Sequence, residues 1–194
     1  MSKPKNRKGK VIVLTAPSGS GKTSIAKRLL NDFDNLKFSV SATTRKPRDG
    51  EINGKDYFFL SDEEFQHKIE TGDFLEWEEF YNNTRYGTLR SEVDKQLESG
   101  YFILLDVEVK GALNIKDIYD DDCLTIFIRP PSLKVIGERL TNRGTETEET
   151  LALRMQRAKM EIEFADKFDV AIINDDFETA YGEAKEVVER FIKQ

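Results

Sequence analysis

The sequence is poor in the residues that most often hold metals or form disulfide bonds. It contains one cysteine, Cys123, and one histidine, His67. A lone cysteine excludes an intramolecular disulfide framework and a cysteine-based metal site, so Cys123, which lies in an apolar run, is expected to pack as a small hydrophobic residue. A lone histidine excludes a multi-histidine zinc site and argues against a serine protease triad. His67 falls on a predicted surface helix.

Long apolar segments are also lacking. No stretch approaches the roughly 18 consecutive apolar residues of a transmembrane helix, and none has the charged start, apolar middle and small-residue end of a secretory signal. Charged residues make up 34% of the chain and hydrophobic residues 38%, a balance typical of globular proteins. We therefore expect a cytoplasmic protein with no membrane contact, and its 194 residues suffice for one α/β domain with inserts.

Acidic residues outnumber basic ones, 36 to 30, but the start of the chain is basic. The net charge is −6, so the fold as a whole is not expected to bind nucleic acid. Residues 1–9 differ, because they form a basic arm that could touch nucleic acid or, as is more common, remain a solvated terminus. The basic residues at this end of the chain are Lys3, Lys5, Arg7, Lys8 and Lys10.

The strongest motif lies between the apolar run 11–14 and a helical pattern of apolar residues. It matches the phosphate-binding loop, or P-loop, pattern G-x-x-x-x-G-K-[ST] at every fixed position except the first, where alanine replaces glycine. An alanine methyl is tolerated there only if φ is negative. We expect the whole loop to bind a nucleoside triphosphate such as ATP through Ala16, Pro17, Ser18, Gly19, Ser20, Gly21, Lys22 and Thr23.

Each part of this loop has a physical task. Gly19 and Gly21 let the backbone bend sharply and bring its N–H groups close to an anion, and the following helix N-terminus adds partial positive charge. Lys22 supplies a full charge for the β- and γ-phosphates, and the Thr23 hydroxyl is the expected Mg²⁺ ligand. The alternative is a glycine-containing turn that binds nothing, but the strand before it and the helix after it favour the P-loop.

The first half of the chain predicts a strand over 11–15, a helix over 22–33 and a short strand over 38–41. A strand over 57–60 follows, then a helix that a capping box opens at Ser61 and Gly72 ends, then a strand over 74–80. Turn dipeptides at 49–50 and 53–54 separate these short elements. This pattern favours an inserted lobe with a mixed sheet over residues 40–89.

The second half alternates helices and strands. It predicts helices over 90–99, 132–142, 148–165 and 177–192, with buried strands over 101–107, 123–128 and 170–173. Such alternation is typical of an α/β fold with a parallel sheet flanked by helices, whose ligand lies at the carboxyl ends of the strands. Asp106 lies at such an end, where an aspartate usually helps to hold Mg²⁺ or its water; the alternative is a helix or turn cap.

The inserted lobe offers groups for a second phosphate and for a base. Arg45 and Arg48 can form forked bonds to phosphate, and Tyr57 can add a hydroxyl donor, although arginines in loops are usually just solvated. Glu76 could accept hydrogen bonds from guanine N1–H and its exocyclic amine. Adenine has no donor at N1 and would leave the carboxylate unpaired. The alternative for Glu76 is a surface charge on an edge strand.

From about residue 10 to 190 the chain resembles guanylate kinase, a nucleoside monophosphate kinase of the P-loop class. The segment from Ser41 to Tyr57 is similar to the family signature almost position for position. The segment 143–148 resembles the family's lid, and 173–176 resembles its late nucleotide-side motif. The resemblance implies transfer of the γ-phosphoryl group from ATP to GMP, and to dGMP as well, with Mg²⁺ as cofactor. It also implies a core over 10–39, 90–135 and 158–194, a GMP-binding lobe over 40–89 and a lid over 136–157.

The resemblance further implies roles for individual residues. The guanine would be contacted by Ser41, Glu76 and Thr88, beside Gly87, and the GMP phosphate by Arg45, Arg48, Tyr57 and Tyr86. Asp106 and Glu108 would line the GMP site, and Asn174 would lie near the adenine of ATP. Catalysis would fall to Lys22, Arg48, Arg139, Arg143 and Arg154.

One further departure from the family pattern is Asp106-Val107-Glu108 in place of Asp-x-Asp, followed by Lys110 where glutamine is common. Glu108 keeps the charge of the family's aspartate but is one methylene longer, so it would reach GMP from a different distance. Two alternatives stay open: a catalytically inactive guanylate-kinase-like module that binds proteins, and a P-loop kinase for another small acceptor. Lys22, Arg143 and Arg154 argue against the first, because inactive modules tend to lose these residues.

Overall fold

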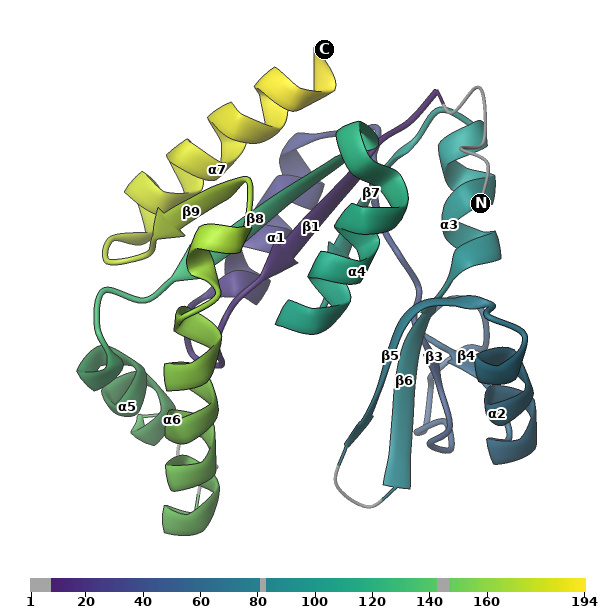
Figure 1. The fold of residues 1–194 in the computed structure, drawn as a ribbon, viewed down its shortest axis with the longest axis horizontal. Coiled ribbons are helices and arrows are strands. Elements are labelled where there is room, and N and C mark those ends of the chain that lie inside the picture. The colour runs from purple at the N-terminus through teal and green to yellow at the C-terminus, as the bar shows by residue number, and fades with distance from the viewer. Residues whose placement is uncertain (1–7, 81–82, 143–146) are drawn as a thin grey trace.

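A computed structural model describes residues 8–80, 83–142 and 147–194 of the chain. Its centre is a five-stranded parallel sheet in the order β2-β7-β1-β8-β9. The strands are β1 (Val11–Thr15), β2 (Leu36–Phe38), β7 (Phe102–Asp106), β8 (Cys123–Arg129) and β9 (Val170–Ile173). The predicted α/β fold with a parallel sheet is confirmed (Figure 1).

Alternating apolar side chains of the central strands bury both faces of this sheet. Ile12 and Leu14 pack with α1 (Lys22–Asp32) and α7 (Phe177–Ile192). Val11 and Val13 point to the opposite face and pack with α3 (Arg90–Glu98) and α4 (Val109–Tyr119). Because successive residues of a strand face opposite sides, one short apolar run supplies both cores. Cys123 belongs to the second core and is 1% exposed, as predicted for a small hydrophobic residue.

The inserted lobe is a separate four-stranded mixed sheet in the order β4-β3-β6-β5. Its strands are β3 (Ala42–Thr43), β4 (Phe58–Phe59), β5 (Phe74–Phe80) and β6 (Thr84–Leu89). Helix α2 (Asp62–Glu70) covers it with Phe65, which stacks on Phe74 at a ring-centroid distance of 4.4 Å. The predicted capping box is present at the start of α2, where Ser61 and Glu64 exchange hydrogen bonds.

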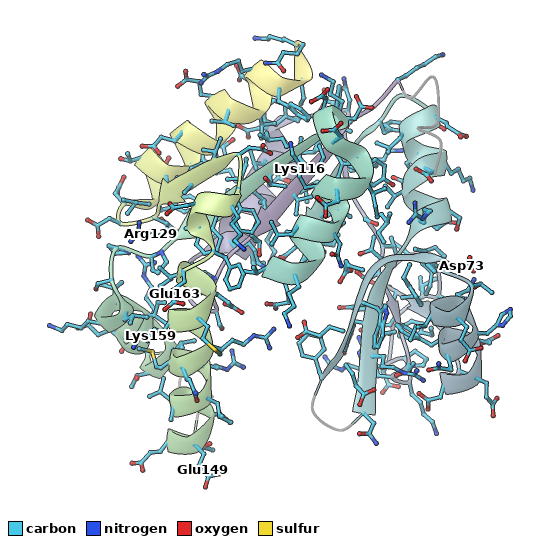
Figure 2. All side chains as sticks on the ribbon, in the orientation of Figure 1. Asp73, Lys116, Arg129, Glu149, Lys159 and Glu163 are labelled. Carbon is cyan, nitrogen blue, oxygen red and sulfur yellow. The ribbon has the colours of Figure 1, made fainter. Side chains whose placement is uncertain are left out.

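Helices α5 (Leu133–Thr141) and α6 (Glu148–Ile162) form a third unit with a small core of their own, made by Ile136, Leu140 and Ala158. Short 3₁₀ turns, η2 (Asp120–Asp122) and η3 (Ala165–Lys167), precede β8 and β9. Helix α6 projects from the central sheet, with Glu163 at its sheet end and Glu149 near its free end (Figure 2). The lobe extends from the same side of the sheet, facing α6 (Figure 1).

Two sequence predictions need correction. The strand predicted over 38–41 is wrong, because β2 ends at Phe38 in the central sheet and β3 begins at Ala42 in the lobe. The chain leaves one sheet for the other between them: Ser39 N still bonds Leu104 O, whereas Ser41 O already accepts from Phe58 N. The helix predicted over 148–165 is also three residues too long, since α6 ends at Ile162.

Besides the short strand β3 and the two 3₁₀ turns, the sequence analysis missed β6 and α4, and each of these two carries a glycine that lowers its propensity. Gly111 lies in α4, and a Cβ there would come within 3.0 Å of the Glu76 side chain. Gly87 lies in β6, where a Cβ would come within 2.9 Å of the Glu76 carbonyl. Close packing across elements therefore requires both glycines, and local propensity alone hides the elements that contain them. Among the described residues, no helix combines the length and apolarity needed to cross a membrane.

Candidate active site

The P-loop connects the carboxyl end of β1 to the N-terminus of α1. Gly19 and Gly21 have φ values of 86° and 90°, a region that favours glycine, and Gly21 is the N-cap of α1. Within the described chain, positive φ outside glycine occurs only at Asn83 and Asp120, so Ala16 meets the condition of a negative φ. The loop lines a pocket of about 550 Å³ with all its residues from 16 to 23. The loop backbone and a helix start thus line one pocket, as a phosphate cradle requires, and phosphate binding itself stays a prediction.

Lys22 and Asp106 form an ion pair at the carboxyl ends of β1 and β7. Their side chains are 16% and 21% exposed and line the pocket, so both charges face it while largely shielded from solvent. Thr23 is exposed at the first turn of α1 and lines the same pocket. Hydroxyl and carboxylate oxygens are the donors that Mg²⁺ prefers, and protein sites usually complete its shell with phosphate oxygens and water. Thr23 and Asp106 therefore fit a cation that arrives with a nucleotide.

Asn174 fixes the P-loop from the end of β9. It is 4% exposed, and its Nδ2 donates to the Ser20 carbonyl at 2.7 Å. A Cβ on Gly21 would come within 2.3 Å of the same amide, so this contact also needs glycine in the loop. The Asn174 carbonyl accepts a 3.0 Å bond from Arg139 Nη2. The structure therefore brings Asn174 and Arg139 to the loop; the adenine contact stays a prediction.

Three of the arginines predicted for catalysis, at positions 139, 143 and 154, fall in the segment predicted as the lid. Arg154 on α6 reaches the P-loop, where Nη1 donates to Ser18 Oγ at 2.8 Å. Arg139 on α5 contacts Asn174, as described above. Arg143 lies outside the described residues. Two of these three arginines therefore contact the P-loop region from different helices: Arg154 bonds the loop itself, and Arg139 bonds the asparagine that holds the loop.

A second pocket, of about 620 Å³, opens between the lobe and the central sheet. Glu76 of β5 lines it, and its Oε1 accepts a 2.6 Å hydrogen bond from the Thr88 hydroxyl of β6. Burial raises the pKa of the Glu76 carboxyl above its ordinary value, and the Thr88 hydroxyl works against that shift. Ser41 and Gly87 line the same pocket. The structure thus brings the residues predicted for guanine into one place.

The predicted phosphate clamp is only partly assembled on this pocket. Tyr57 and Tyr86 line it, with ring centroids 5.9 Å apart. Arg45 lies over the Tyr57 ring and forms a forked pair with Glu51, both distances being 2.6 Å. Arg45 lowers the pKa of Glu51 to about 2. Arg48 is exposed in the adjoining turn, where its backbone N–H donates to Glu51. The sequence analysis did not predict that Glu51 would accept hydrogen bonds from both Arg45 and Arg48.

The two pockets share a wall. Lys22, Phe80, Asp106 and Glu108 line both of them. A group held in one pocket can therefore face a group held in the other across the Lys22–Asp106 pair. This arrangement suits transfer of a charged group between two bound anions.

Charged residues that line only one of the two pockets were missed by the sequence analysis. Arg157 of α6 pairs with Glu78 of β5, Glu108 before α4, and Glu161 one turn along its own helix. Its spacing of four from Glu161 could have suggested that pair from the sequence. Nothing local could have indicated Glu78 or Glu108 as partners, because they are 79 and 49 positions away.

Comparison with known proteins agrees with this geometry. The family model described as guanylate kinase matches residues 8–191. The guanylate kinase of Salinibacter ruber is 50% identical over 182 residues, covering 94% of this chain and 96% of that protein. The guanylate kinase of Bacteroides thetaiotaomicron is 46% identical over 190 residues, covering 98% of this chain and 93% of that protein.

A solved structure shares the fold as well. The crystal structure of guanylate kinase from Anaplasma phagocytophilum is similar with a TM-score of 0.72 and 28% sequence identity, covering 96% of this chain and 87% of that one. The similarity spans the central sheet, the lobe and the α5–α6 unit together, because nearly the whole chain is covered. The chain therefore belongs to the guanylate kinase family of nucleoside monophosphate kinases.

Proposed function

We propose that this protein transfers the γ-phosphoryl group of ATP to GMP, and to dGMP, giving ADP and the corresponding diphosphate. The observation that carries the proposal is the wall shared by the P-loop pocket and the Glu76 pocket. ATP would bind in the first pocket and GMP in the second, so that the reacting phosphates meet beside Lys22. The base and phosphate contacts proposed for GMP leave the sugar aside, which is why dGMP is included.

The specificity for guanine would come from Glu76 and Thr88, with Ser41 beside them. A buried carboxylate accepts from N1–H and the exocyclic amine of guanine. Adenine would leave it unpaired in a site that already disfavours the charged form. Arg45, Arg48, Tyr57 and Tyr86 would bind the GMP phosphate; for Arg45 this means sharing or leaving Glu51.

Catalysis would rest on charge neutralisation and positioning. The acceptor is a phosphate oxygen that is already largely ionised at neutral pH, so no general base is required. The obstacle is repulsion between two polyanions, which Lys22 and the arginines at positions 48, 139, 143 and 154 would offset. When bound, Mg²⁺ would add Lewis-acid charge neutralisation on the ATP phosphates, held through Thr23 and Asp106.

Three parts of the chain would cooperate in this reaction. We propose a core over 10–39, 90–135 and 158–194, a GMP-binding lobe over 40–89, and a lid over 136–157. The lobe and the α5–α6 unit have small cores of their own, which supports movement of each as a body. Their closure would exclude water and so suppress ATP hydrolysis.

A coupled assay that supplies ATP with each of GMP, dGMP, AMP, CMP and UMP tests the proposal. We expect rapid ADP formation with GMP and dGMP and little with the other three. Turnover with AMP or a pyrimidine nucleotide in preference to GMP would instead indicate a kinase for another acceptor. No turnover with any of them would favour an inactive protein-binding module.

A further inference from the structure

Arg157 is the centre of a charge cluster that the proposed mechanism does not use. Its Nη2 lies 2.9 Å from Glu78 Oε1 and 3.1 Å from Glu108 Oε2, and its Nε lies 2.9 Å from Glu161 Oε1. The three carboxylates come from the lobe, from the residue that caps α4, and from α6 itself. One guanidinium therefore connects the α5–α6 unit to the lobe and to the start of α4, which packs on the central sheet.

Two of these carboxylates line the pocket proposed for GMP. Glu78 lines that pocket, and Glu108 lies on the wall that both pockets share. The charges of Glu78 and Glu108 both act to raise the pKa of Glu76. Each of these two carboxylates is therefore close enough to repel the Glu76 carboxylate. GMP would bring further negative charge to the same place. Some cation must hold these carboxylates if an anion is to bind beside them.

The geometry assigns that task to Arg157, and we propose that Arg157 is a positioning residue for GMP. It does not line the GMP pocket and acts through Glu78 and Glu108, whose carboxylates it holds against α6. Glu108 is thereby kept at the shared wall, where it borders the pocket that Glu76 lines. This inference rests on the proposed function, because it concerns the same acceptor site.

The obvious alternative is that Arg157 binds the ATP phosphates, because it lines the P-loop pocket beside Arg154. Its bonds argue against this. Arg154 reaches the loop itself at Ser18, whereas Arg157 is engaged with three carboxylates. An arginine so paired would have to release at least one buried or half-buried carboxylate to bind phosphate, which is costly.

The test separates the two Michaelis constants. We expect R157Q to raise the KM for GMP roughly tenfold and to change kcat and the KM for ATP by about twofold or less. R157K should raise the KM for GMP less, because lysine keeps the charge but loses the fork. The matched control is K159Q, which removes the same charge from the same helix (labelled in Figure 2). Lys159 is exposed and about 200° around the helix from position 157, so K159Q should behave as wild type.

A second substitution distinguishes positioning from general damage. Adding E78Q to R157Q removes one carboxylate that the first change leaves unpaired, so the double variant should recover part of the lost GMP affinity. An equal rise in both KM values, a rise for ATP alone, or no recovery in the double variant would overturn the inference. If circular dichroism shows that R157Q folds poorly, R157K provides the test instead, with a smaller expected rise in the KM for GMP. Failure of the wild-type protein to phosphorylate GMP would refute the proposed function instead.

Discussion

Lys22 and Asp106 are two of the four residues that line both pockets, and both are mostly shielded from solvent. In the proposed mechanism, a lysine in this position would stabilise charge that develops between the donor and acceptor phosphates. We expect Lys22→Ala to lower kcat by about 10²-fold or more while the fold remains intact, because the side chain is not part of either core. Steady-state assays with circular dichroism measure both quantities.

Lys27 provides the control for this variant. It is exposed on α1, five positions further along, and its replacement by alanine should leave turnover unchanged. If Lys22→Ala turned over at the wild-type rate, the P-loop would have no part in the reaction.

Glu76 tests base specificity at the same scale. Glu76→Gln keeps the size of the side chain but presents an amide donor to the donors of guanine, so the KM for GMP should rise about 10²-fold. The KM for ATP should change little, since Glu76 does not line the P-loop pocket. Separate titrations of GMP and ATP measure the difference, with Glu79→Gln, an exposed carboxylate on the same strand, as control. Equal losses for both nucleotides would contradict the assignment.

Residues of this kind were predictable because their chemistry is local. The P-loop needs a fixed spacing of glycines, lysine and threonine, and that spacing is visible in the chain. The pairing of Arg45 with Glu51 was not foreseen, because it depends on how the turn between them folds.

At the scale of elements, the P-loop depends on a strand more than 150 residues away. Asn174 follows β9 and donates its side-chain amide to the Ser20 carbonyl. Asn174→Ala should leave that buried carbonyl unpaired, lower the free energy of unfolding by about 1–3 kcal/mol, and raise the KM for ATP more than that for GMP. Chemical denaturation and steady-state kinetics measure these effects.

The control for Asn174 is Asn31→Ala, on the exposed side of α1. This change removes the same amide without disturbing the loop, so stability and both KM values should stay near wild type. A wild-type KM for ATP in Asn174→Ala would mean that the amide holds the loop only for stability.

Elements with strong periodicity were predicted well, whereas β6 and α4 were not. Both contain a glycine that their packing requires, at Gly87 and Gly111, and both lie against Glu76. The close packing of these two elements against Glu76 therefore comes with glycines that weaken the local sequence signal for both. A Cβ at position 111 would lie 3.2 Å from Glu76 Oε2, so glycine leaves room for that carboxylate beside α4.

At the scale of the whole molecule, we expect stability to depend on pH through Glu161, which lies with Arg157 and Glu108 where α6 meets the start of α4. Burial and the neighbouring Glu108 carboxylate raise the pKa of Glu161 from its ordinary 4.5 to about 7, against the opposing effect of Arg157. Between these values the folded protein keeps a proton that the unfolded chain releases, so this group's contribution to stability falls as pH rises from about 4.5 to 7 and is then constant.

Glu161→Gln should remove this dependence. The free energy of unfolding of the variant should decline less between pH 5 and pH 8 than that of the wild type, because glutamine does not titrate. Urea denaturation at a series of pH values gives the difference curve, in which the groups common to both proteins cancel. Parallel curves for the two proteins would show that Glu161 titrates alike in the folded and unfolded states.

The sequence by itself determined the phosphate-binding loop, the parallel α/β core, the inserted lobe and the family, because each depends on short-range spacing or on periodicity that local sterics and burial impose. The tertiary structure alone decided which charges meet: Lys22 with Asp106, Arg154 with Ser18, and Arg157 with carboxylates from three places. The physical reason is that ion pairs act through space, so their partners are chosen by how sheets and helices pack and leave no periodic trace along the chain.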